Sequence, residues 1–127
     1  VGTGRMASIH FKNLANHPTA RCDFVVSNSL SRAQQFISTH TSNVNGQPST
    51  KASSDLPALL QQHRHEIDGV IITSNSKQHY SDIKTSLLNE KPVFVEKPMA
   101  ESVAEIDQLY ELAAERNLPA ILVGYQR

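Results

Sequence analysis

A charged pair follows directly on a short apolar run near residue 95. The segment reads Val93-Phe94-Val95-Glu96-Lys97-Pro98, and an apolar run of this length is typical of a buried parallel strand. Ligands bind at the carboxyl ends of parallel strands in open α/β folds, so we expect Glu96 and Lys97 at that edge. Lys97 can there donate a hydrogen bond to a hydroxyl or help to remove its proton. On spacing alone, an exposed strand end with an internal ion pair is the favoured reading.

A glycine turn opens the chain as Gly2-Thr3-Gly4-Arg5-Met6-Ala7, the pattern G-x-G-x-x-A. One glycine permits the tight turn, the next lets the backbone approach a pyrophosphate, and the small Ala7 lets helix and strand pack closely. Amides at the helix start and the helix dipole then attract the phosphates. Such triplets also occur in ordinary turns, and only Val1 stands where a preceding strand is expected. The pattern predicts a dinucleotide site if βα alternation follows it.

The end of the second strand normally carries an acid that binds the adenosine ribose about 20 residues after the turn. Here the position falls on Asn28, an amide, which does not repel a 2′-phosphate as a carboxylate would. Ser29 and Arg32 can bind such a phosphate, so NADP stands beside NAD as the cofactor. The alternative, weighed as about equal, is that Asn28 bonds the ribose hydroxyls and Arg32 is a solvated helix residue.

Short apolar runs alternate with segments of helical period, which predicts βαβ units and a doubly wound parallel sheet of the α/β class. Ser54 is expected to cap the third helix. Ala33, Phe36 and Ile37 are expected to face the core from the second helix, and Val103, Ile106, Tyr110 and Ala113 from the last one. Helices are predicted at 6–16, 31–39, from about 56, at 77–89 and at 102–116; strands at 22–26, 51–53, 69–72, 92–95 and 120–123; and an exposed loop with an Asn45-Gly46 turn at 39–50.

Length and composition favour one soluble, cytoplasmic domain. The chain has 127 residues, 12 basic and 12 acidic side chains and one cysteine, Cys22. The balanced charge gives no reason to expect nucleic acid or a membrane as partner. A lone cysteine excludes an internal disulfide framework and suits a reducing compartment. The length suffices for a nucleotide domain but not for a substrate domain as well.

Several other polar or aromatic residues have an ordinary structural reading. His63 and His65 lack the further ligands of a metal site and are expected at a solvated helix end. His10 is expected to be a packing or surface residue. Cys22 is expected to be a small buried strand residue. Tyr125 can close over a cofactor or be a buried aromatic at the end of a strand.

Four segments together resemble the glucose–fructose oxidoreductase / inositol 2-dehydrogenase (Gfo/Idh/MocA) family. They are G-T-G-R-M-A-S-I-H, I-I-T-S-N-S-K-Q-H, V-F-V-E-K-P-M-A and L-V-G-Y-Q-R, and they extend over essentially the whole chain. The Glu-Lys-Pro element is the specific part. The G-R-x-x-x-x-H opening is most similar to that of inositol dehydrogenases.

The resemblance implies a role for each matching position. Lys97 would be the catalytic lysine, and Glu96 would hold the nicotinamide ribose region. The family's proton-accepting histidine and its partner aspartate come from a second domain. The cofactor-binding positions are Gly2, Gly4, Arg5 and Met6 at the pyrophosphate, Asn28 at the adenosine ribose, and Thr73, Asn75 and His79 along the cofactor.

The sequence departs from the family pattern at three places. Ser74 replaces a proline, Asn28 replaces an acid, and the first strand is absent except for Val1. That strand belongs between the second and the fourth, so we expect an incomplete chain, or a sheet whose halves close up or stay open. The predicted domains are an N-terminally truncated NAD(P)-binding domain at 1–123 and the start of a crossover at 124–127.

The predicted function is hydride transfer between NAD or NADP and a secondary alcohol of a polyol or sugar, in a full-length protein that forms a homo-oligomer. This chain alone is expected to be inactive. A dinucleotide-sensing regulatory module, as in the family's galactose-pathway repressor, is the alternative, and an intact Lys97 argues against it because a sensor does not need that amine. A non-functional remnant is the third possibility.

Overall fold

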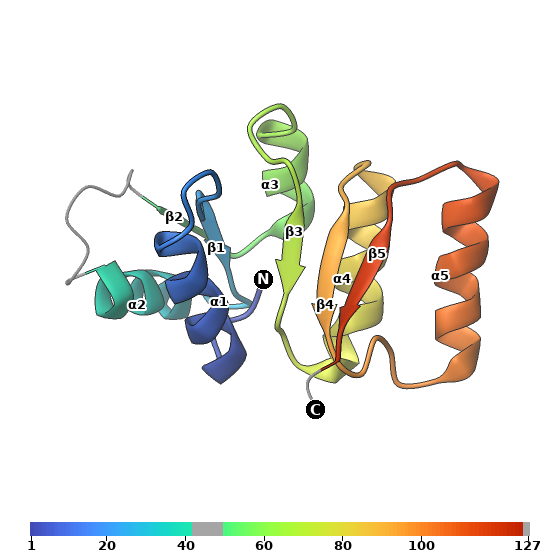
Figure 1. The fold of residues 1–127 in the computed structure, drawn as a ribbon, viewed down its shortest axis with the longest axis horizontal. Helices are drawn as coiled ribbons and strands as arrows, with labels where there is room; N and C mark the ends of the chain where they lie inside the picture. The colour runs from blue at the N-terminus through green and yellow to red at the C-terminus, as the bar shows by residue number, and fades with distance from the viewer. Residues whose placement is uncertain (42–49, 126–127) are drawn as a thin grey trace.

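Helices and strands alternate along the chain in the computed structural model, which describes residues 1–41 and 50–125 (Figure 1). The predicted Asn45-Gly46 turn and residues 126–127 lie outside the described residues. The elements are α1 (Arg5–Ala15), β1 (Phe24–Val26), α2 (Leu30–Thr41), β2 (Lys51–Ser53), α3 (Leu56–Gln62), β3 (Val70–Ile72), α4 (Ser76–Leu88), β4 (Val93–Glu96), α5 (Val103–Glu115) and β5 (Ile121–Gly124).

All the paired strands run parallel. β3, β4 and β5 form one sheet in that order, with Val70 opposite Val93 and Val93 opposite Ile121. β1 and β2 form a second sheet, with Val25 opposite Ala52. Helical crossovers join the consecutive parallel strands that pair, as the βαβ unit requires. The predicted α/β class with a parallel sheet is therefore confirmed.

Val1 and Gly2 link the two sheets. The Val1 amino group donates to the Ile71 carbonyl at 2.6 Å, and the Thr73 amide donates to the Val1 carbonyl at 2.8 Å. On the other side, the Gly2 amide donates to the Val26 carbonyl at 2.8 Å. These bonds place Val1 and Gly2 between β1 and β3, where a doubly wound fold has its first strand. The two halves of the sheet have not closed on each other.

Residues of β1 face two hydrophobic clusters, one on each side of the sheet. Val25 packs with Ala7 and Phe11 of α1 and with Ala33 and Phe36 of α2. Val26 belongs to the larger cluster, to which α3, α4 and α5 contribute. Adjacent strand residues point to opposite faces, so this strand separates helices on both sides. The larger cluster consists of Val26, Leu56, Leu59, Leu60, Val70, Ile72, Ile83, Leu87, Val93, Val95, Met99 and Leu109.

Side-chain caps fix the starts of several helices. Asp55, not Ser54, caps α3, because its carboxylate accepts from the Ala58 amide at 2.9 Å. The Ser54 prediction was wrong by one residue. Ser102 and Glu105 form a reciprocal capping box on α5, which fixes the helix start directly after the Glu-Lys-Pro segment.

The buried face of α5 differs from the predicted one. Leu109 is its one fully buried residue, whereas Val103 is 73% exposed and Tyr110 is 53% exposed. Ile106 and Ala113 do pack against the core, as predicted. The predicted face contained Tyr110, whereas the structure buries Leu109. Helical spacing alone does not distinguish the two faces, because Ile106, Leu109 and Ala113 lie on one side of a helix equally well.

The other boundaries differ by at most two residues. β1 begins at Phe24 rather than Cys22, and α2 extends to Thr41, two residues past its predicted end. Ala33 and Phe36 are buried in α2, and Ile37 packs beside them, as predicted. Within residues 1–41 and 50–125, no helix is both long and apolar enough to cross a membrane.

Candidate functional site

The two glycines of the opening turn have different surroundings. Gly2 has φ +102°, and a Cβ there would lie 2.6 Å from the Thr73 carbonyl carbon and 2.7 Å from the Ser74 nitrogen. Gly4 is the N-cap of α1, makes no side-chain capping bond and has nothing within 4 Å of its Cβ position. Gly2 is thus required for close packing of the backbone, whereas Gly4 leaves open space before a helix start that can receive a phosphate.

The loop after β3 lies directly against this turn. Thr73 bonds to the Val1 carbonyl through both its amide and its hydroxyl, at 2.8 Å and 2.9 Å. Asn75 caps α4 by accepting from the Lys77 amide at 3.1 Å. The Ser74 hydroxyl donates to Asp82 at 2.6 Å. Ser74, where the resemblance implies a proline, is therefore anchored to α4 by its side chain.

His79 joins the loop after β3 to the Glu-Lys-Pro segment. Its side chain is buried, with 2% of the residue exposed. Nδ1 lies 2.6 Å from the Pro98 carbonyl oxygen, and Nε2 lies 2.9 Å from the Ser74 carbonyl oxygen. The imidazole therefore spans the ends of two neighbouring strands, β3 and β4, and does not point into solvent. This geometry assigns His79 a structural role at the rim of the site.

Glu96 and Lys97 have opposite environments at the end of β4. Glu96 is 8% exposed and lies 2.8 Å from Nε2 of His10. Lys97 is exposed, and the peptide bond to Pro98 is cis. The lysine amine is thus accessible to a ligand at the sheet edge, while the carboxylate is held against α1. His10 also packs edge-on against the Phe94 ring, as expected of a packing residue, and its contact with Glu96 was not predicted.

The end of β1 carries the residues predicted to meet the adenosine ribose. Asn28 is exposed, and its side-chain oxygen lies 3.4 Å from the Ser27 hydroxyl. Ser29 and Ser31 share a hydroxyl–hydroxyl bond of 2.8 Å, and Arg32 is exposed in the first turn of α2. These polar groups lie at the same carboxyl edge as the glycine turn, since Gly2 bonds to Val26.

Burial changes the acidity of three groups near the centre of the molecule. Desolvation raises the pKa of Asp82 above its usual 3.8, against the opposing effect of the Ser74 hydrogen bond. Desolvation also lowers the pKa of the Val1 amino group and raises that of the Cys22 thiol. In each case burial disfavours the charged form. A raised thiol pKa makes Cys22 a poor nucleophile.

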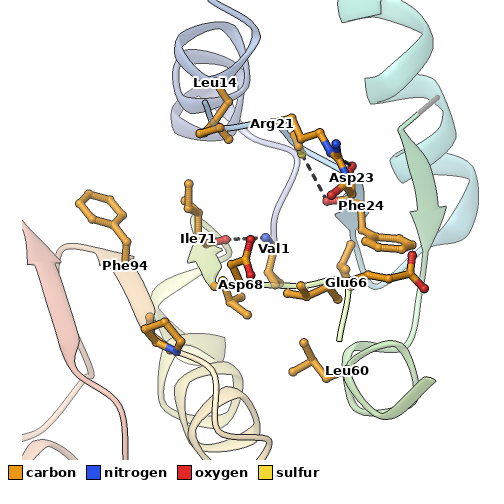
Figure 2. Close-up of a pocket in the computed structure, with 18 of the residues that line it drawn as sticks. Val1, Leu14, Arg21, Asp23, Phe24, Leu60, Glu66, Asp68, Ile71 and Phe94 are labelled. Atoms are coloured by element: carbon orange, nitrogen blue, oxygen red, sulfur yellow. Dashed lines mark hydrogen bonds and ion pairs between the residues drawn. The ribbon is translucent and has the colours of Figure 1, made fainter. Parts of the chain in front are cut away.

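A groove of about 710 Å³ separates the amino halves of β1 and β3. Figure 2 shows Val1 among the residues that line it, bonded to Ile71, together with Phe24 and Leu60. Charged side chains, among them Asp23 and Glu66, also line it. The groove is continuous with the strand position that Val1 occupies. It lies away from the carboxyl edge where Lys97 and the glycine turn are found.

Of the remaining residues, His63 fits its structural reading, whereas Cys22 and Tyr125 do not. His63 bonds Glu66 at the end of α3, and the described part of the chain contains no group of His, Cys, Asp and Glu able to hold a metal ion. Cys22 is partly buried and precedes β1, so the prediction of a buried strand residue was wrong. Tyr125 is 81% exposed, so the reading as a buried strand-end aromatic was wrong.

Helices on both faces of a parallel sheet, and a glycine turn at its carboxyl edge, define the class as a doubly wound dinucleotide-binding domain. The sequence agrees along nearly its whole length. Residues 1–125 match the Gfo/Idh/MocA family model, described as an oxidoreductase family with an NAD-binding Rossmann fold. The chain belongs to this family.

Inositol dehydrogenases are among the proteins most similar to this chain. Inositol 2-dehydrogenase of Rubrobacter xylanophilus is 30% identical over 128 residues, covering 100% of this chain and 34% of that protein. The structure of myo-inositol dehydrogenase from Lactobacillus casei with NAD(H) and myo-inositol matches with a TM-score of 0.81 and 25% identity, covering 97% of this chain and 34% of that one.

A second solved structure holds the other form of the cofactor. A mutant 3-ketoreductase from Actinomadura kijaniata in complex with TDP-benzene and NADP matches with a TM-score of 0.71 and 25% identity. The match covers 92% of this chain and 34% of that one. The chain thus spans about a third of the length of these relatives.

Proposed function

We propose that this chain binds NAD or NADP across the carboxyl edge of its sheet and forms the nucleotide-binding part of a dehydrogenase for a secondary alcohol of a polyol or sugar. The observation that carries the proposal is a continuous series of contacts along this edge. The glycine turn packs on Thr73 and Ser74, and His79 connects Ser74 to Pro98, beside Lys97. A single extended ligand can therefore reach from the turn to the lysine.

The residues present fit the pyrophosphate of such a ligand. The start of α1 has no side-chain cap, and the Cβ position of Gly4 faces open space. We assign Gly2, Gly4, Arg5 and Met6 to the turn that holds the pyrophosphate. Gly2 acts indirectly, by letting the turn lie on the loop after β3. The exposed Arg5 can supply a positive charge at the helix start, where the dipole already favours an anion.

The nicotinamide end would lie near β4. The cofactor, when bound, supplies the hydride acceptor. Lys97 is exposed at this end and is proposed as the catalytic residue that holds or moves the proton of the substrate hydroxyl. Glu96 would face the nicotinamide ribose, and Thr73 and Asn75 would border the middle of the cofactor. His79 would hold the loop after β3 and the Glu-Lys-Pro segment in fixed positions relative to each other.

The choice between NAD and NADP depends on the end of β1. Asn28 carries no charge, and the exposed Arg32 follows it in the first turn of α2. Both residues are compatible with a bound 2′-phosphate, and Asn28 can equally form hydrogen bonds to free ribose hydroxyls. Relatives of this fold are seen with either cofactor, so the proposal includes both.

Substrate specificity and full activity would require residues outside this chain, because the relatives are about three times as long. The proposed boundary of the nucleotide domain is residue 123, one residue before β5 ends at Gly124. We propose that the complete protein supplies a proton acceptor and a pocket wall from a further domain, and that it is a homo-oligomer.

Titration of the chain with NADH and with NADPH, followed by nicotinamide fluorescence, tests the proposal. We expect saturable binding of at least one nucleotide, and no oxidation of myo-inositol or glucose above background by the chain alone. A Lys97→Ala variant should still bind, as should the control Lys12→Ala on the exposed side of α1. Absence of binding to both nucleotides would refute the proposed function. Turnover by the chain alone would refute its dependence on a second domain.

A further inference from the structure

A hydrogen bond joins α1, the helix proposed to hold the pyrophosphate, to the end of β4. Nε2 of His10 in α1 lies 2.8 Å from Oε1 of Glu96. The two side chains are only 20% and 11% exposed, and 86 positions separate them in the sequence. A carboxylate can only accept, so the histidine nitrogen donates. The neighbouring Lys97 is exposed, so the restraint applies to Glu96 alone.

The surroundings of this pair leave Glu96 little freedom. The His10 ring meets the Phe94 ring edge-on, with centroids 5.1 Å apart. Behind them, a Cβ added at Gly124 would lie 2.7 Å from the Phe94 ring and 3.5 Å from Oε1 of Glu96. The carboxylate is therefore packed between β5 on one side and α1 on the other. Rotation away from His10 would leave the buried carboxylate without this partner, which is costly for a charged group.

We propose that His10 is a positioning residue. It holds the Glu96 carboxylate in place for the nicotinamide ribose and links this carboxylate to α1, the helix that would hold the pyrophosphate. The inference rests on the proposed function. His10 lies five residues after Arg5 in the same helix, a rise of about 7.5 Å. Because α1 is rigid over that length, one element determines the positions of both the pyrophosphate and the nicotinamide ribose. A charge-assisted hydrogen bond provides directional restraint of this kind.

A purely structural contact between His10 and Glu96 would have a different consequence. It would affect folding stability and would weaken every nucleotide ligand alike, including ones without nicotinamide. A positioning role is specific to the nicotinamide half. ADP-ribose contains the adenosine, the pyrophosphate and the second ribose but no nicotinamide ring, whereas ADP also lacks that ribose. A comparison of NADH with ADP therefore isolates the part of the ligand that Glu96 would contact.

The experiment measures the Kd of NADH, ADP-ribose and ADP by calorimetry for wild type, His10→Leu and His10→Gln, with thermal melts as the folding control. Leucine removes the donor, while glutamine retains an N–H group at similar reach. We expect His10→Leu to weaken NADH roughly tenfold and ADP less than about twofold, with ADP-ribose following NADH. His10→Gln should recover most of the NADH affinity.

The remaining outcomes separate this inference from the proposed function. Equal losses for NADH and ADP, or no loss for either, would overturn the positioning role while leaving nucleotide binding intact. Failure of wild type to bind any of the three ligands would overturn both. If His10→Leu does not fold, Glu96→Gln supplies the comparison. This variant should weaken NADH and ADP-ribose but not ADP, and equal losses for NADH and ADP would again overturn the positioning role.

Discussion

Substituting alanine at each glycine of the opening turn should separate a structural glycine from a binding one. Gly2→Ala places a methyl group 2.6–2.7 Å from backbone atoms of Thr73 and Ser74, at φ +102°. Those atoms belong to the loop that bonds Val1 and cannot move without breaking the link between the sheets. Gly4→Ala adds the same methyl group where nothing lies within 4 Å, at φ −86°.

The magnitudes follow from these surroundings. At Gly2, left-handed backbone strain costs an L-residue roughly 1–2 kcal/mol, and overpacking adds about 1–3 kcal/mol. The sum is about 2–5 kcal/mol. For a domain of this size, 1 kcal/mol corresponds to roughly 4 °C in Tm, so Gly2→Ala should lower Tm by about 8–20 °C. Gly4→Ala should cost at most about 1 kcal/mol as an N-cap change, yet weaken NADH at least roughly tenfold by blocking the pyrophosphate.

Circular-dichroism melts and NADH fluorescence titrations on the two variants and wild type measure both quantities. The reasoning predicts opposite patterns, with stability lost in Gly2→Ala and binding lost selectively in Gly4→Ala. A Gly2→Ala protein that melts within 2–3 °C of wild type, well below the roughly 8 °C minimum set by the strain and overpacking estimates, would refute the packing argument. A Gly4→Ala protein with unchanged NADH affinity would refute the assignment of the phosphate site.

Three further substitutions test other parts of the molecule. Asp82→Asn keeps an acceptor for Ser74 but removes a carboxyl whose pKa is raised by burial above 3.8. Because the folded wild type binds that proton more tightly than the unfolded chain, the Tm advantage of the variant should be absent below pH 3.8, grow as pH rises through the raised pKa and then level off. An advantage that is constant in thermal melts from pH 3 to 8 would count against the burial effect. Asn28→Asp should raise the ratio of NADPH Kd to NADH Kd roughly tenfold through repulsion of the 2′-phosphate; an unchanged ratio in fluorescence titrations would place the ribose elsewhere. Ser102→Ala removes the capping box of α5 and should lower Tm by roughly 4 °C, for a loss of about 1 kcal/mol, without affecting NADH titrations; a change in NADH affinity would contradict a purely structural cap.

The site was predictable where local sequence carries the chemistry. The glycine spacing, the apolar run before Glu96 and the loop at Thr73–Asn75 were all visible in the sequence, and the structure brings these segments to one edge of the sheet. His10 was missed because its partner is 86 residues away. The pattern G-R-x-x-x-x-H was itself the available signal, since it places a histidine on the helix that begins at the turn.

The sequence by itself determined the order and type of the elements, because apolar periodicity, caps and turn glycines act within a few residues of each other. The α/β alternation and the parallel sheet follow from these local patterns and from chain connectivity. Only the tertiary structure decided which residues meet. The burial of Leu109 rather than Tyr110, the bond from Val1 to Ile71 and the pairing of His10 with Glu96 all depend on how separate elements pack. Such contacts join distant parts of the chain, so the local sequence around each residue does not predict them.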